Sequence, residues 1–293
     1  MSLLSRLRPI VGALALMLTA GLPASAEPLA KDVFGSVRGP TAGAPQAIGF
    51  YSKGCASGLV QLPETGPTWQ AMRLSRNRNW GHPQLVGLLE DLSRQATRFG
   101  WQGIYVGDMS QPRGGPMLTG HASHQLGLDA DVWMLPPASL HLTPAQRESI
   151  SSQSIVNKRG TQLTSLWSPA HAALLQAAAS DPRVQRVFVD PMAKVWMCQN
   201  IRGDRGFLSK IRPIQAHDYH FHIRLACPAG SSACQTQDAV PPGDGCGEAA
   251  KWIADRINPP KRNPTPPDPD YRHPRSYRLS ELPPQCTAVG LAR

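Results

Sequence analysis

Two short segments of the chain hold five of its nine histidines, together with several aspartates. Residues 120–131 read GHASHQLGLDAD, and residues 217–222 read HDYHFH. Imidazole and carboxylate groups are common zinc ligands, and neutral imidazole also accepts protons near pH 7. The two segments therefore predict one hydrolytic site that contains a metal ion.

The second segment has the pattern of a β-strand that continues to Leu225. Side chains alternate between the faces of a strand, so His220 and His222 would point to one side, with their bases about 7 Å apart. One imidazole could then bind a metal while the other moves a proton. The residues expected on the opposite face are apolar and suited to a core: Phe221, Ile223 and Leu225.

The first segment adds a loop histidine and an aspartate. His124 lies between two glycines, and Asp131 belongs to residues 129–135, an alternating stretch whose other face is apolar. One loop histidine, Asp131 and one histidine of the distant strand make three ligands and leave a fourth position open, as in catalytic rather than structural zinc sites. Asp129 shares the face of Asp131, and we expect it to orient a ligand.

The elements around these segments predict one α+β domain, because short strands are mixed with well-separated helices. We expect helices at residues 83–99 and 169–179 and short strands at residues 102–107, 129–135, 184–189 and 220–225. Two segments rich in proline and glycine are expected to be irregular, the lead-in at residues 27–60 and the tail at residues 259–284.

The start of the chain predicts export. Residues 1–26 combine two arginines, an apolar run from Ile10 to Leu22 and the sequence Ala24-Ser25-Ala26, which together are typical of a cleaved signal peptide. No stretch is long enough to span a bilayer, so we expect no membrane span in the mature chain, which begins at Glu27.

The composition, 41% hydrophobic and 17% charged, excludes a wholly disordered chain and a multi-span membrane protein. Lys and Arg exceed Asp and Glu by 10, which favours an anionic partner. Because the chain is expected to be exported, we expect cell wall, anionic lipid or an extracellular polymer as that partner and no nucleic acid.

All six cysteines follow the predicted cleavage site, and an even number in an oxidising compartment predicts three disulfides. Six cysteines allow 15 pairings, among which the sequence alone does not choose. Cys227 and Cys234 are close enough to close a small loop. No C-x-x-C motif occurs, so a thiolate metal site is not expected.

The two histidine segments closely resemble those of the penicillin-insensitive murein endopeptidases, which belong with the lysostaphin-type, D-Ala-D-Ala-type and hedgehog-type zinc proteins. Residues 121–131 and 217–222 carry the resemblance. Residues 72–78 (MRLSRNR) with 81–83 (GHP), and 181–189 (DPRVQRVFV), support it, and it extends over about residues 40–290.

The resemblance implies a periplasmic zinc endopeptidase that hydrolyses D-alanyl–meso-diaminopimelyl cross-links between peptidoglycan stems. We expect one such domain over residues 27–293, with a proline-rich tail from about residue 258. Its fold should be a central, mainly antiparallel sheet flanked by helices and long disulfide-pinned loops.

The resemblance implies three zinc ligands, His124, Asp131 and His222. It also implies a further metal contact at His121 and catalytic roles for His220 and His217. The implied disulfides are Cys55–Cys286, Cys198–Cys246 and Cys227–Cys234. Three arginines are candidates for binding a substrate carboxylate or a developing oxyanion: Arg73, Arg76 and Arg78.

Other interpretations remain open at this level. H-x-H on a strand is also typical of paired surface histidines, and the arginines equally suit a solvated basic turn. A D,D-carboxypeptidase that trims terminal D-Ala and a non-catalytic, zinc-dependent wall-binding protein are the alternative functions. Related proteins can carry a second metal on an extra Asp and His, but residues 157–161 read NKRGT, so one ion is expected. The sequence leaves a homodimer open.

Overall fold

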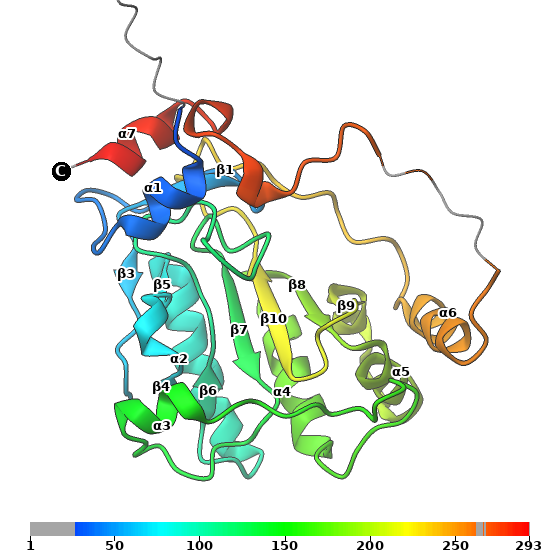
Figure 1. Ribbon diagram of the computed structural model, residues 1–293. Helices are drawn as coiled ribbons and strands as arrows, with labels where there is room; N and C mark the ends of the chain where they lie inside the picture. The colour runs from blue at the N-terminus through cyan, green and yellow to red at the C-terminus, as the bar shows by residue number, and fades with distance from the viewer. Residues whose placement is uncertain (1–26, 262–265, 267, 293) are drawn as a thin grey trace, which may run out of the picture.

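The computed structural model of the chain describes residues 27–261, 266 and 268–292. The predicted signal peptide and part of the proline-rich tail lie outside these residues. A six-stranded sheet forms the centre of the fold (Figure 1). Its strands, in spatial order, are β4 (Trp69–Ala71), β6 (Ile104–Val106), β7 (Asp129–Trp133), β10 (His220–Leu225), β8 (Val184–Val189) and β9 (Ile211–Pro213).

The three inner pairings of the sheet are antiparallel, and the two outermost pairings are parallel. The predicted α+β fold with a mainly antiparallel sheet is therefore confirmed. Strands β8 and β10 have the predicted bounds, while β6 and β7 are one to two residues shorter at their ends than expected. No helix of the described residues is long and apolar enough to cross a membrane.

The register between β7 and β10 brings the two histidine segments together. His222 lies directly opposite Asp131, and Arg224 lies opposite Asp129. Directly opposed residues of an antiparallel pair have their Cβ atoms only about 5 Å apart on the same face. A single register therefore places the strand histidines beside the strand aspartates.

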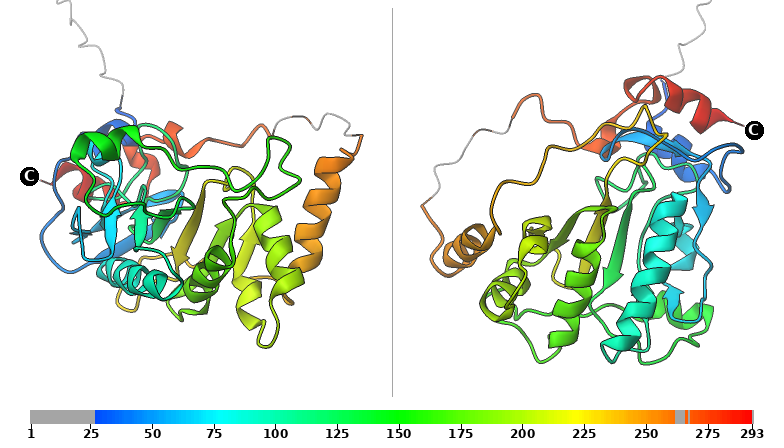
Figure 2. Two further views of the ribbon diagram at one scale, coloured as in Figure 1. Left: turned by 90° about the horizontal axis from the view of Figure 1, so that it is seen from below. Right: turned by 180° about the vertical axis from the view of Figure 1, so that it is seen from behind.

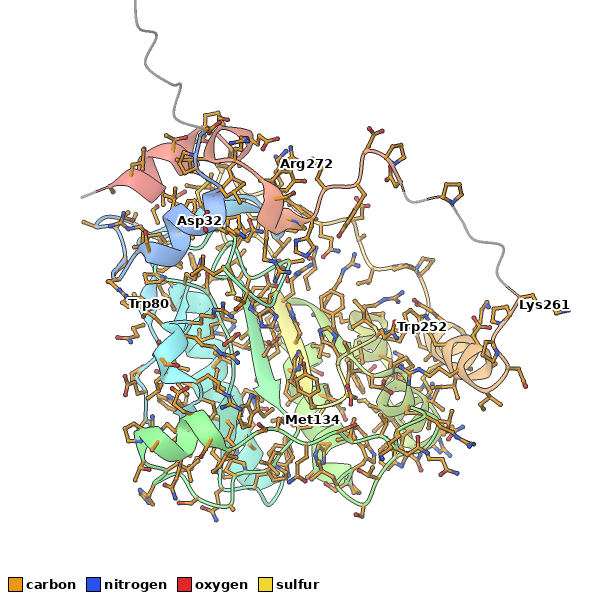
Figure 3. All side chains as sticks on the ribbon, viewed as in Figure 1. Asp32, Trp80, Met134, Trp252, Lys261 and Arg272 are labelled. Atoms are coloured by element: carbon orange, nitrogen blue, oxygen red, sulfur yellow. A yellow bond between two sulfur atoms is a disulfide. The ribbon has the colours of Figure 1, made fainter. Side chains whose placement is uncertain are left out.

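The other face of these strands belongs to the main core. Val132 and Phe221 are buried there against leucines of α2 (Pro83–Arg98) and α4 (Pro169–Ser180). These helices pack together behind the sheet, as the rear view in Figure 2 shows. Met134, which follows β7, is fully buried at the end of that strand (Figure 3). The opposite face of β7 and β10 is left for polar side chains.

Both predicted helices begin at the expected prolines, because each is capped from the preceding turn. The His82 side chain accepts a hydrogen bond from Gln84 N at the start of α2. At the start of α4, His171 Nδ1 accepts a hydrogen bond from Ser168 N, and its Nε2 lies 2.8 Å from the Met134 carbonyl oxygen. The cap thus also joins α4 to the end of β7.

The lead-in is not irregular, and that prediction was wrong. It contains α1 (Ala30–Ser36) and a hairpin of β1 (Gln46–Phe50) and β2 (Lys53–Ser57). These elements bury Phe34 against α7 (Gln285–Leu291) in a small second core. Because this core joins the two ends of the described chain, no local sequence pattern indicates it.

Several other elements were not predicted, and most are short. They are β3 (Val60–Gln61), β4, β5 (Trp80–Gly81), β9, α3 (Pro144–Ser149), α5 (Pro191–Asn200), α6 (Cys246–Ile257) and α7. The described part of the tail is not wholly irregular either, since it forms 3₁₀ turns at Pro274–Ser276 and Leu279–Glu281.

Three disulfides fasten the outlying segments: Cys55–Cys286, Cys198–Cys246 and Cys227–Cys234. These are the pairs that the family resemblance implies. The first joins β2 to α7 and so holds the C-terminal segment on the lead-in. Before reaching α7, the tail touches the site loop, where Arg275 donates a hydrogen bond to the Gly120 carbonyl.

Removing the Cys55–Cys286 bond should destabilise the protein most. The bond spans 231 residues, whereas Cys227–Cys234 spans 7, so it restricts the unfolded chain far more. We expect C55S/C286S to lower the free energy of unfolding by about 5 kcal/mol and C227S/C234S by about 2 kcal/mol. Urea unfolding followed by tryptophan fluorescence measures both, and equal losses would contradict this ranking.

Candidate metal centre

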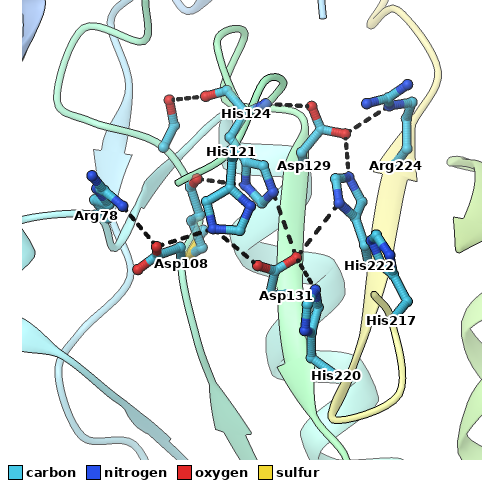
Figure 4. A network of polar contacts seen from close by, with 12 residues as sticks. Arg78, Asp108, His121, His124, Asp129, Asp131, His217, His220, His222 and Arg224 are labelled. Atoms are coloured by element: carbon cyan, nitrogen blue, oxygen red, sulfur yellow. Dashed lines mark hydrogen bonds and ion pairs between the residues drawn. The ribbon is translucent and has the colours of Figure 1, made fainter. Parts of the chain in front are cut away.

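All the histidines and the aspartate predicted for the site lie together on the polar face of β7 and β10 (Figure 4). Asp131, His220 and His222 come from these strands, and His217 comes from the loop before β10. The loop before β7 supplies the remaining two histidines. Four of these histidines, His121, His217, His220 and His222, line a cavity of about 660 Å³ that opens to solvent.

Asp131 is the centre of the cluster and is buried. Its Oδ1 atom lies 3.5 Å from each of three imidazole nitrogens, His124 Nε2, His220 Nε2 and His222 Nδ1. The same oxygen has no hydrogen-bond partner. Buried polar atoms in folded proteins are nearly always satisfied, so this oxygen indicates a ligand.

His124 is held with one nitrogen directed at Asp131. Its Nδ1 lies 2.7 Å from the Met109 carbonyl and so carries the proton, which leaves a lone pair on Nε2. That Nε2 atom is also buried without a hydrogen-bond partner. The backbone of His124 has φ = 67°, a left-handed conformation that is unusual outside glycine and typical of functional sites.

His222 is oriented from behind by a carboxylate. Its Nε2 donates to Asp129 Oδ1 at 2.7 Å, which leaves the Nδ1 lone pair facing Asp131. Asp129 also accepts a hydrogen bond from Arg224 Nε at 2.7 Å, and this guanidinium lies between the rings of Tyr51 and Phe188, 4.2 and 5.1 Å from their centres. A metal-binding histidine usually has such a carboxylate on its other nitrogen.

His121 lies at the solvent side of the cluster. Its Nε2 is 3.1 Å from Asp108 Oδ2 and 3.4 Å from Asp131 Oδ2. Potential ligand atoms of His121, His124 and Asp131 all lie within 4.8 Å of one another. Since His121 already has Asp108 as a partner, it suits a peripheral contact better than a central one.

Two of the distances between the donor atoms are compatible with a tetrahedral ion. Bonds of about 2.0–2.1 Å at tetrahedral angles place ligand atoms roughly 3.3 Å apart. Asp131 Oδ1 lies 3.5 Å from both His124 Nε2 and His222 Nδ1. Two nitrogen donors and one oxygen donor suit zinc among other divalent metals, and they leave one position open.

Electrostatics also favour a cation at this point. Burial alone would raise the pKa of Asp131, but the charges of His220, His124 and His121 lower it well below its usual value. Burial alone would lower the pKa of His124, but the charge of Asp131 raises it. The cluster therefore holds a buried negative charge that attracts either a proton or a metal ion.

His217 and His220 are suited to moving protons. Burial, together with the charge of His220, lowers the pKa of His217 to about 4. Burial also lowers the pKa of His220. Because both pKa values are lowered, both rings are neutral bases beside the carboxylate at neutral pH. The two rings lie 4.8 Å apart.

The three arginines have different surroundings. Arg78 is buried and donates to Asp108 and to the Thr119 carbonyl. Arg76 also contacts Asp108, at 3.0 Å, but its side chain is 47% exposed. Arg73 donates to Ser151 and lines a second cavity beside Asp131. Arg76 and Arg78 thus line the site cavity, and Arg73 and Arg76 line the second one, although Arg78 is largely buried.

Asp108 and Arg224 were not predicted as site residues from the sequence. Asp108 follows the short buried strand β6, and Arg224 lies two residues after His222 on its face. A carboxylate at a strand end and a charged residue in phase with H-x-H were the available signals. The role of each depends on a partner at least 30 residues away, which spacing does not indicate.

Comparisons with known proteins match most of the chain. A family model described as penicillin-insensitive murein endopeptidase matches residues 47–290. Among relatives with that name, one from Haemophilus influenzae is 44% identical over 70% of this chain and 72% of its own length. Others from Klebsiella pneumoniae and Escherichia coli are 40% and 38% identical over 92% of this chain and 94% of theirs.

Replacing Asp108 should lower the stability of the protein more than replacing its half-exposed partner Arg76. Removing its charge leaves the buried guanidinium of Arg78 unpaired, so we expect D108N to lower the free energy of unfolding by about 3 kcal/mol or more. R76A removes a half-exposed partner and should cost about 0–1 kcal/mol. Urea unfolding compares the two, and an equal loss would refute the distinction between the arginines.

Proposed function

Because the chain belongs to the penicillin-insensitive murein endopeptidase family, we propose that this peptidoglycan hydrolase is a zinc enzyme that cleaves D-alanyl–meso-diaminopimelyl cross-links. The observation that supports a bound metal ion is the state of Asp131 Oδ1. This oxygen is buried, receives no hydrogen bond and faces the lone pairs of two imidazoles. A divalent ion bound between these donor atoms would satisfy that oxygen.

His124, Asp131 and His222 are the proposed ligands, and His121 is a further metal contact. His124 and His222 each present a lone pair because the opposite nitrogen is occupied, by a carbonyl and by Asp129 respectively. A zinc ion bound there would supply Lewis acidity, lowering the pKa of a water molecule towards 7 and polarising the scissile carbonyl.

His220 is the proposed general base, with His217 beside it. A neutral imidazole can take a proton from the attacking water and return it to the leaving amine. His220 Nε2 lies 3.5 Å from Asp131 Oδ1, which would stabilise the imidazolium while it holds that proton. Arg73 and Arg76 border the cleft and can bind a substrate carboxylate.

The proposed location is the periplasm, reached through the predicted signal peptide at residues 1–26. Three disulfides and the wall polymer as substrate support a site outside the cytoplasm.

A D,D-carboxypeptidase is the second candidate, since the same catalytic set would release a terminal D-Ala. Chromatography of the products distinguishes the two, because only an endopeptidase converts cross-linked dimers into monomers. A pure binding protein would not require His220, whose ring is placed beside the proposed ligands.

The metal requirement can be tested with muropeptide dimers. Chelation should stop conversion to monomers, zinc should restore it, and the protein should hold about one zinc ion per chain. H124A should lower the zinc content more than about tenfold, because a ligand is lost. H141A, at an exposed histidine before α3, is the control, and undiminished zinc in H124A would rule out this ligand.

Separating the base from the ligands needs a second variant. We expect H220A to keep its zinc but to lower kcat by about 10²–10⁴-fold, because the proton acceptor is lost. Zinc analysis and dimer cleavage are measured on the same preparation. Loss of zinc with substantial remaining activity would show that His220 is a ligand instead.

A further inference from the structure

The cleft does not end at the histidine cluster. The site cavity is bordered by Ala216, and Ala216 also lines a neighbouring cavity of about 480 Å³. We call this neighbour the side groove. The residues of the side groove that matter here are Asn157, Lys158, Arg159, Gln215, Ala216 and Asp218. A substrate chain leaving the cluster past Ala216 would enter it.

One wall of the side groove is a fixed turn. Gly160 N donates to the Asn157 carbonyl at 2.8 Å, and the Asn157 side chain accepts from Thr161 N at 3.0 Å. Lys158 and Arg159 are at the tip of this turn and are exposed. Among the described residues neither has a side-chain hydrogen bond or an ion pair, so both charges remain available to a ligand.

The other charges of the side groove largely cancel. Arg256 is paired with Asp190 at 2.8 Å and donates to the Gly160 carbonyl. What remains is two cations, Lys158 and Arg159, against the carboxylate of Asp218. The groove therefore has one excess positive charge facing solvent, which suits a ligand with a carboxylate.

The junction of the two cavities is conformationally unusual. Ala216 has φ = 63°, in the left-handed region, although it has a Cβ. It directly precedes His217 and is exposed, as is Gln215. Non-glycine residues held in this region cost free energy and concentrate where a ligand is bound.

We propose that the side groove binds one stem peptide of the cross-linked substrate through its free carboxylates, with Lys158 and Arg159 as the contacts. This inference rests on the proposed function, because it assumes a muropeptide in the cleft. The glutamyl and diaminopimelyl residues of a stem supply such carboxylates. The two cations bind but do not react, so they set affinity and the preference for free over amidated stems.

The test compares two double charge reversals. K158E/R159E changes the side groove, and K31E/R98E makes the same charge change at solvent-accessible cations of α1 and α2, away from it. With carboxylate-bearing dimers we expect K158E/R159E to raise KM about tenfold with kcat nearly unchanged. A tenfold change corresponds to the loss of two exposed ion pairs. K31E/R98E should leave KM unaltered. K158Q/R159Q should raise KM less.

Amidated dimers provide the chemical control. With those carboxylates blocked, K158E/R159E and the unaltered protein should have the same KM. An unchanged KM with free carboxylates, an equal rise in K31E/R98E, or an equal rise with amidated dimers would each overturn the proposal.

Equilibrium binding separates this proposal from the proposed function. The dissociation constant of a carboxylate-bearing dimer is measured for H220A with and without K158E/R159E. About tenfold weaker binding in the triple variant supports the side groove even if the unaltered protein cleaves no dimers. That lack of cleavage would refute only the proposed function. Equal binding overturns the side groove even if cleavage occurs.

Discussion

The site depends on one buried charge. Asp131 is ionised within the fold, and its Oδ1 atom is surrounded by imidazole nitrogens without receiving a hydrogen bond. A carboxylate in such a place is costly unless a cation compensates it. The register of β7 and β10 fixes this position, because it sets His222 opposite Asp131. The sheet, the helices behind it and the capping of those helices all serve to hold that register.

A row of paired groups supports the centre from the side away from solvent. The rings of Tyr51 and Phe188 hold the Arg224 guanidinium, Arg224 neutralises Asp129, and Asp129 orients His222. Each step satisfies a charge that would be unfavourable alone. On the open side, Asp108 holds Arg78 and His121 in a similar way. The cluster is thus fixed before any ligand enters, which favours catalysis over adaptable binding.

Local sequence patterns were sufficient for the parts of the fold that bury one face. Helices α2 and α4 and strands β8 and β10 follow from apolar spacing, proline and glycine signals, and alternation. The histidine segments were found from residue type and phase alone. The α1 element and the first hairpin were missed because they are stabilised by α7, more than 200 residues away. Asp108 and Arg224 were missed for the same reason, since their partners are distant in sequence.

The Cys55–Cys286 bond has a consequence for the order of assembly during biosynthesis. Cys286 follows Cys55 by 231 residues, so this bond forms only after that whole stretch has been synthesised and the thiols have met an oxidant. The same terminal segment passes the loop that carries His121, through the contact between Arg275 and Gly120. A chain that has not yet reached Cys286, or one kept under reducing conditions, therefore lacks the disulfide that holds this segment beside the cluster. Completion of this hydrolase is thereby delayed until the segment that carries Cys286 has been made and oxidised.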